Sequence, residues 1–157
     1  MSAAATFLTS LLFFLASFSL SAADLSDLSY EISEETVAIT ACDPAAAGEL
    51  VIPNTIEGYP VISIGNGAFR ACASLTSVSL PDSVAGIGNS AFLGCIALTG
   101  MVMPEAITVI EHSTLSGCAD LIELIIPGGV TAIGHDAFSN CSRLTGLLIP
   151  GEVTSIG

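Results

Sequence analysis

Cysteine is the residue type in this sequence whose number and spacing could most readily support chemistry. Four of the five cysteines recur every 23 residues, at Cys72, Cys95, Cys118 and Cys141. Zinc sites use paired ligands a few residues apart, and the sequence has no C-x-x-C. We favour a stack of buried free thiols, which behave as small hydrophobic groups. Disulfides are the alternative, because strands about 4.8 Å apart fall within bridging range. Cys42 lies outside the period and has no assignable role.

The two histidines form the only other group that could bind a metal ion. His112 and His135 are 23 residues apart, and Glu111 and Asp136 are their sequence neighbours. Imidazole and carboxylate are suitable ligands for several transition metals. The equivalent positions in the preceding units hold Asn66 and Asn89. We therefore favour exposed polar turn residues and predict no metal site.

No pattern indicates catalysis or a bound cofactor. The stretch Gly86 to Ala91 matches G-x-G-x-x-A, but it lacks the long helix and the acidic residue that a dinucleotide site requires. A nucleophile elbow, a phosphate-binding loop and a zinc-protease motif are all missing from the sequence. Asn140-Cys-Ser142 fits a glycosylation pattern, although its middle residue belongs to the cysteine series. We predict no catalytic residues and no cofactor, so the protein is not expected to be an enzyme.

Composition narrows the classes of partner. The 157 residues carry fifteen acids against two basic residues, Arg70 and Arg143, for a net charge of −13. Such a chain cannot neutralise nucleic-acid phosphates or supply a polybasic patch for anionic lipid. A hydrophobic content of 52% is too high for an acidic disordered chain. After residue 23, no apolar run approaches the roughly 20 residues of a membrane span.

The N-terminal segment 1–23 resembles an export signal. An apolar stretch from Phe7 to Leu20 leads to small residues at Ser21 and Ala23, and acidic residues follow. We predict a signal peptide cleaved after Ala23 and a secreted or cell-surface location. The lack of a basic residue before Phe7 leaves an uncleaved anchor and a buried core helix as alternatives.

The rest of the chain is organised by a 23-residue repeat. Its prolines fall at Pro81, Pro104, Pro127 and Pro150, and several apolar positions and the cysteines keep the same spacing. The units are 53–80, 81–103, 104–126, 127–149 and a partial 150–157. The first has five extra residues, interpreted as a surface loop around Gly58 and Tyr59.

A single unit of this size cannot bury enough apolar surface to offset the backbone entropy lost on folding. Stacked units can, so the repeat predicts a solenoid. The alternating segment before each proline, such as 75–80, indicates a short strand in a parallel sheet. Ser90, Ser113 or Asp136 then serves as the N-cap of one helical turn. Segment 24–52 breaks the period and is predicted to be an N-terminal cap with strands at 30–33 and 36–40.

One outward-facing position is unexpectedly apolar. Ser79, Val102, Ile125 and Leu148 should all point away from the core, and the last three form an apolar stripe. Such a patch can mark a partner site, so Val102, Ile125 and Leu148 are the candidate ligand-binding residues. Alternatively, the stripe is covered within a larger protein.

The unit L-x-x-V-x-L-P-x-x-V-x-x-I-G-x-x-A-F-x-x-C resembles the BspA-like leucine-rich repeats of bacterial secreted and surface proteins, from Val51 to Gly157. The resemblance implies a leucine-rich-repeat solenoid of short parallel strands and single helical turns. It also implies an exported binding or adhesion module for a protein or glycan partner. The alternative is a structural repeat segment or fragment of a larger envelope protein without its own ligand. The last rung, which ends at Gly157, would then be covered by further repeats or by self-association.

Overall fold

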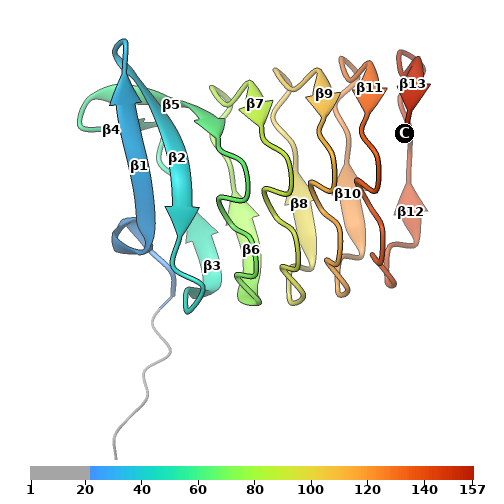
Figure 1. Ribbon diagram of the computed structural model, residues 1–157, viewed down its shortest axis with the longest axis horizontal. Helices are drawn as coiled ribbons and strands as arrows, with labels where there is room; N and C mark the ends of the chain where they lie inside the picture. The colour runs from blue at the N-terminus through green and yellow to red at the C-terminus, as the bar shows by residue number, and fades with distance from the viewer. Residues whose placement is uncertain (1–21) are drawn as a thin grey trace, which may run out of the picture.

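The computed structural model describes residues 22–157, which form a solenoid of about five turns. Figure 1 shows the turns side by side along the long axis, from the N-terminal strands to the last repeat. Most of the predicted signal segment lies outside the described residues. Ala23 is buried, and its N–H donates to Ala47 O at 2.9 Å. Within residues 22–157, no helix is long and apolar enough to cross a membrane.

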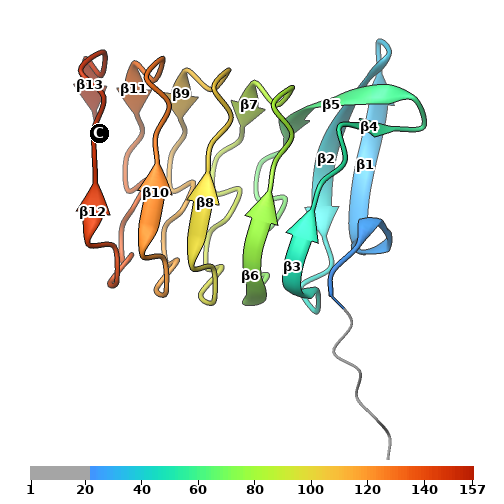
Figure 2. The same ribbon diagram turned by 180° about the vertical axis from the view of Figure 1, so that it is seen from behind.

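The main sheet is parallel and contains one strand from each turn of the solenoid. Its strands follow the order β3, β6, β8, β10 and β12 along the molecule, as Figure 2 shows from behind. They are β3 (Ala47–Val51), β6 (Ser74–Ser79), β8 (Gly100–Val102), β10 (Glu123–Ile125) and β12 (Gly146–Leu147). The last four coincide with the segments predicted before each proline. The first lies within the predicted cap, so the parallel sheet begins earlier in the chain than the period does.

The N-terminal strands close one end of the solenoid. After a short 3-10 helix η1 (Leu25–Asp27), β1 (Leu28–Ser33) and β2 (Thr36–Cys42) form an antiparallel pair, which confirms the two strands predicted there. β2 then pairs in parallel with β5 (Tyr59–Ile64). The five extra residues of the first unit form part of a hairpin between β4 (Thr55–Ile56) and β5.

A second row of short strands occupies another face, and it is interrupted. The row contains β5, β7 (Gly86–Ile87), β9 (Val109–Ile110), β11 (Ala132–Ile133) and β13 (Ser155–Ile156). β5 pairs with β7, and β9, β11 and β13 form their own sheet. Among residues 22–157, no strand pairing joins β7 to β9.

The interruption coincides with Glu111, which replaces the glycine found in the other units. Gly88 N–H donates to Ile64 O at 2.9 Å, and Gly134 N–H donates to Ile110 O at 2.7 Å. A Cβ on Gly134 would lie 2.7 Å from the backbone of the rung before it. Glu111 carries such a Cβ, and no equivalent bond from its N–H to Ile87 O is formed. The side chain therefore prevents the close approach that joins the rungs elsewhere.

The predicted helical turn is instead a series of hydrogen-bonded turns, so the N-cap assignment was wrong. Ser90, Ser113 and Asp136 have φ values of 55°, 53° and 57°, in the left-handed region rather than the extended region of an N-cap. Alternate N–H groups here bond to the next rung; Phe92 N–H donates to Thr114 O at 2.9 Å. Because these donors point along the solenoid axis, they cannot form the i→i−4 bonds of a helix.

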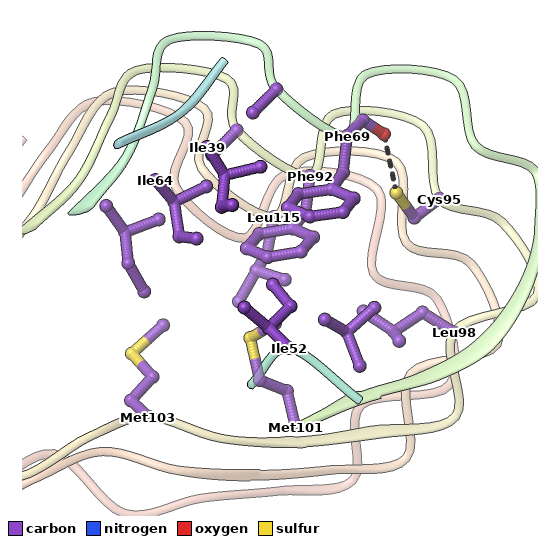
Figure 3. Packing of buried hydrophobic residues seen from close by; sticks show 14 of the residues in the cluster. Ile39, Ile52, Ile64, Phe69, Phe92, Cys95, Leu98, Met101, Met103 and Leu115 are labelled. Carbon is purple, nitrogen blue, oxygen red and sulfur yellow. Dashed lines mark hydrogen bonds between the residues drawn. The ribbon is translucent and has the colours of Figure 1, made fainter. Parts of the chain in front are cut away.

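Equivalent side chains of successive turns stack to form one continuous core. The rings of Phe69 and Phe92 lie parallel with centroids 4.9 Å apart, and Leu115 continues the same stack (Figure 3). All three side chains are fully buried. The repeat thus brings each outward-facing position of a strand beside its equivalent in the next turn, about 4.8 Å away.

Candidate functional site: the outer face of the main sheet

The stripe predicted from the sequence lies on the outer face of the main sheet. Val102 is 64% exposed, Ile125 61% and Leu148 84%. Ile125 lies beside Val102 in the register of β10 and β8, and β10 also pairs with β12, which Leu148 directly follows. The structure therefore brings the three residues together on consecutive turns. Their role in binding stays a prediction.

Val51 extends this stripe, although the 23-residue period did not predict it. It is 70% exposed and pairs with Ser79 in the register of β3 and β6. The hairpin insertion places Val51 off the 23-residue period, which concealed it. The signal was nevertheless present, because Val51 precedes Ile52-Pro53 as Ser79 precedes Leu80-Pro81. We call Val51, Val102, Ile125 and Leu148 the apolar column; Ser79 is its one polar interruption.

Two shallow hollows adjoin the apolar column. The first, of about 590 Å³, lies around Gly100 and is lined by Ser77, Ser79, Val102 and Ile125 among others. The second, of about 580 Å³, lies around Gly146 and is lined by Ile125 and Leu148. Both glycines occupy the same outward position of the unit. Because neither carries a side chain, the aliphatic groups of the column stand beside open space.

Three carboxylates line the first hollow. Asp82, Glu105 and Glu123 are exposed, and none of them has an ion pair or side-chain hydrogen bond within residues 22–157. The ion pairs of the described chain lie elsewhere, between Arg143 and Asp120 at 3.3 Å and between His135 and Asp136 at 3.5 Å. No basic side chain lines the hollow.

The repeated cysteines form a series of thiol hydrogen bonds between rungs. The Sγ atoms of Cys95, Cys118 and Cys141 donate to the carbonyl oxygens of Phe69, Phe92 and Leu115 at 3.0, 3.2 and 3.1 Å. Figure 3 shows the first of these bonds. All the cysteines of the chain are free. Burial raises the pKa of the Cys118 thiol to about 12 and raises that of Cys95 further. These thiols are therefore protonated packing groups and poor nucleophiles.

Cys42, which had no assignable role, lies beside the first of these cysteines. The Sγ atoms of Cys42 and Cys72 contact the same carbonyl oxygen, Asp43 O, at 3.6 and 3.7 Å. The interaction with Cys72, together with burial, raises the pKa of the Cys42 thiol. Cys42 thus extends the cysteine series into the first turn, where the irregular spacing hid it.

The histidines belong to a second series of side-chain contacts. Asn66 Oδ1 accepts the N–H of Asn89 at 2.8 Å, and Asn89 Oδ1 accepts the N–H of His112 at 3.2 Å. His112 Nδ1 then accepts the N–H of His135 at 3.1 Å. A ring nitrogen that accepts this bond is unavailable to a metal ion. In residues 22–157, no three His, Cys, Asp or Glu side chains converge as a metal site would require.

The stretch from Gly86 to Ala91, which matches the dinucleotide-binding pattern, packs against the preceding turn of the solenoid. Gly88 lies so close to the preceding rung that an added Cβ would be 2.9 Å from Gly65 C and 2.7 Å from Asn66 N. The close packing of the two backbones therefore explains why position 88 is a glycine.

The fold and the periodic packing define a leucine-rich-repeat solenoid. A family model described as the BspA type leucine rich repeat region matches residues 46–157 in six copies. The chain belongs to this family, and the expected fold class is confirmed.

Solved bacterial proteins share the fold. A leucine-rich repeat protein of T. pallidum is 31% identical with a TM-score of 0.79, over 87% of this chain and 64% of that protein. One from Bacteroides ovatus is 30% identical with a TM-score of 0.76, over 83% and 36% of the two chains. A leucine rich cell surface protein of Faecalibacterium prausnitzii is 31% identical with a TM-score of 0.56, over 82% and 37%. This chain thus spans less than two thirds of these relatives. A search of curated proteins found no match.

Proposed function

We propose that this chain is an exported, non-enzymatic binding module whose main-sheet face contacts a protein or glycan partner. The apolar column is the observation that carries the proposal. Isolated exposed aliphatic residues are common on soluble proteins, whereas contiguous apolar patches mark interaction surfaces. Val102, Ile125 and Leu148 share one outward position on consecutive turns, and the two hollows beside them leave room for a ligand.

The family relationship supports an extracellular location. One of the similar structures is described as a cell surface protein, and segment 1–23 has the pattern of an export signal. Mass spectrometry of the protein from the medium or envelope tests both points. A mature N-terminus at Asp24 would support them, and an intact Met1 in the cytoplasm would refute them.

The binding role is tested by replacing three of the four residues of the apolar column, the ones on consecutive turns, while leaving the core untouched. The variant combines Val102→Ser, Ile125→Ser and Leu148→Ser. A matched control changes three exposed aliphatic residues elsewhere, Ile62→Ser, Ile96→Ser and Val109→Ser. Each protein is screened against a glycan array and a random-peptide display library, and its folding is checked by circular dichroism.

The proposal expects ligands that bind the wild type and the control but not the column variant. If the column variant fails to fold while the control folds, the column is core and the proposal is wrong. If all three proteins fold and give the same ligands, or none, the main-sheet face is not a binding surface. The alternative of a structural repeat segment would then be favoured.

A further inference from the structure

The hollow around Gly100 combines two kinds of surface that a neutral ligand would not satisfy together. Val102 and Ile125 supply exposed aliphatic groups. Asp82, Glu105 and Glu123 supply unpaired carboxylates. We propose that this hollow binds a protein segment in which lysine or arginine side chains neighbour aliphatic ones. The inference rests on the proposed binding function of the main-sheet face and specifies its partner.

The positions of the acids favour a cationic partner. Asp82 and Glu105 occupy the same place in consecutive units, so their carboxylates lie on neighbouring rungs. Glu123 precedes Ile125 by two residues on the same outward face of β10. The acids therefore stand on both sides of the apolar column. Asp82 and Glu105 lie in the turns after β6 and β8, where like charges on neighbouring rungs repel each other, and no basic residue of the described chain pairs with either of them.

The two arginines lie away from the hollow. Arg143 donates from its Nη1 to Asp120 Oδ1 at 3.3 Å, and Arg70 lies in the turns between β5 and β6. Neither contacts the hollow. The described chain therefore leaves the three carboxylates available to cations of a partner.

The apolar lining favours a protein segment over a sugar. The carboxylates could accept hydrogen bonds from some hydroxyl groups of a glycan, but the hydroxyl groups laid across Val102 and Ile125 would lose water without a hydrogen-bond partner, which is unfavourable. Aliphatic side chains have no such penalty on this surface. In an extended segment, neighbouring side chains point to opposite sides, and the flexible stem of lysine lets its ammonium group reach a lateral carboxylate.

The test uses a fluorescein-labelled peptide of alternating lysine and valine, titrated with the purified chain in low-salt buffer and followed by anisotropy. Two peptides serve as controls, one with glutamate in place of lysine and one with serine in place of valine. The site variant combines Asp82→Asn, Glu105→Gln and Glu123→Gln. Its matched control, Glu31→Gln, Glu34→Gln and Glu35→Gln, removes the same charge from the β1–β2 hairpin.

The lysine–valine peptide should bind the wild type, and both control peptides should bind at least about tenfold more weakly. The site variant should lose about tenfold in affinity, since three exposed charge pairs together contribute about one order of magnitude. The hairpin control should change affinity less than about twofold. Added salt should weaken the wild-type complex because the carboxylates are exposed.

Equal loss in the two triple variants would overturn the inference, because it would show attraction to the overall negative charge. Absence of lysine–valine binding would also overturn it. Failure of this inference can be distinguished from failure of the proposed function. If the array or library yields a neutral, acidic or sugar ligand that depends on the apolar column, the binding face stands and its cationic preference is wrong.

Discussion

Replacing Gly88 with alanine tests whether rung-to-rung backbone contact limits what each unit can contain. An alanine Cβ at this position would lie 2.5 Å from Asn66 Oδ1, 2.7 Å from Asn66 N and 2.9 Å from Gly65 C. Two of these three atoms belong to the backbone, so they cannot move aside without separating the rungs. Separation would break the bonds from Gly88 N–H to Ile64 O and from Asn89 N–H to Asn66 Oδ1.

The expected destabilisation follows from those bonds. Two hydrogen bonds of about 1 kcal/mol each are lost. Alanine returns about 0.4–1 kcal/mol by restricting the unfolded chain. If the rungs stay together instead, overpacking costs about 1–3 kcal/mol. After the gain from alanine is subtracted, Gly88→Ala should lower the free energy of unfolding by about 1–2 kcal/mol on either route.

Gly86 provides the matched control two residues away. Its φ is not in the left-handed region, and an added Cβ would meet nothing within 4 Å. Gly86→Ala should therefore be neutral or stabilise the protein by up to about 1 kcal/mol. The reciprocal change, Glu111→Gly, should let β7 and β9 pair and slow amide hydrogen exchange at residues 108–111.

The assay is equilibrium urea denaturation followed by far-ultraviolet circular dichroism, with hydrogen exchange for Glu111→Gly. Similar losses for Gly86→Ala and Gly88→Ala would refute the reasoning, because only one of them meets the neighbouring rung. Unchanged exchange in Glu111→Gly would show that the side chain is not the cause of the interruption.

Three further predictions concern the stacked columns. In urea denaturation, Phe92→Ala should lower the free energy of unfolding by about 3–5 kcal/mol. Phe92→Leu should lower it by only about 1 kcal/mol, because it loses the ring stack on Phe69 but still fills the core. Equal losses for the two variants would contradict the stacking of side chains. Asn66→Ala should lower the free energy of unfolding by about 1 kcal/mol, because it removes the acceptor of Asn89 N–H. Asn66→His should be nearly neutral, because the His112 side chain also accepts the N–H of the next rung. A loss of stability in Asn66→His as large as in Asn66→Ala would argue against this shared role. Burial raises the pKa of the Cys118 thiol from its ordinary value of 9.0 to about 12 in the folded protein, so the native state holds the proton more tightly than the unfolded chain. The protonated Cys118 thiol makes its full contribution to the free energy of unfolding below pH 9. That contribution should fall by about 1.4 kcal/mol per pH unit as the pH rises from 9 towards 12. Denaturation at pH 8, 9 and 10 should show a shallower decline for Cys118→Ala than for the wild type, and parallel declines would contradict it.

The period alone was enough to predict the buried columns and the main-sheet strands β6, β8, β10 and β12, but not β3. Leu75, Phe92 and Cys118 must each lie against equivalents in neighbouring turns, and all three are buried. The turn conformation was not predictable in this way, because the donors at Ser90 and Phe92 bond to another rung rather than along the chain. Spacing shows that two rungs are adjacent but does not show which of their atoms form hydrogen bonds.

The missed features share a different cause, namely departure from the period. Val51 and Cys42 belong to columns of the array, but the hairpin insertion and the N-terminal strands place them out of step with it. Of the three acids around Gly100, Asp82 and Glu105 keep the 23-residue spacing, but Glu123 occupies another position of its unit, so spacing alone does not group the three. They meet only because adjacent rungs and adjacent ends of a strand enclose one hollow.

The fold requires apolar side chains in the core columns, but it does not require them at the outward positions of the main sheet. Ser79 occupies the apolar column in one turn, and it still pairs in register with Val51 of β3. The stack therefore tolerates a polar side chain there, and the aliphatic groups at Val102, Ile125 and Leu148 are not needed to hold the rungs together. Exposed to water, they add little to folding stability. The fold neither needs nor fully buries these side chains, so substitutions there test the proposed partner without first disturbing the solenoid.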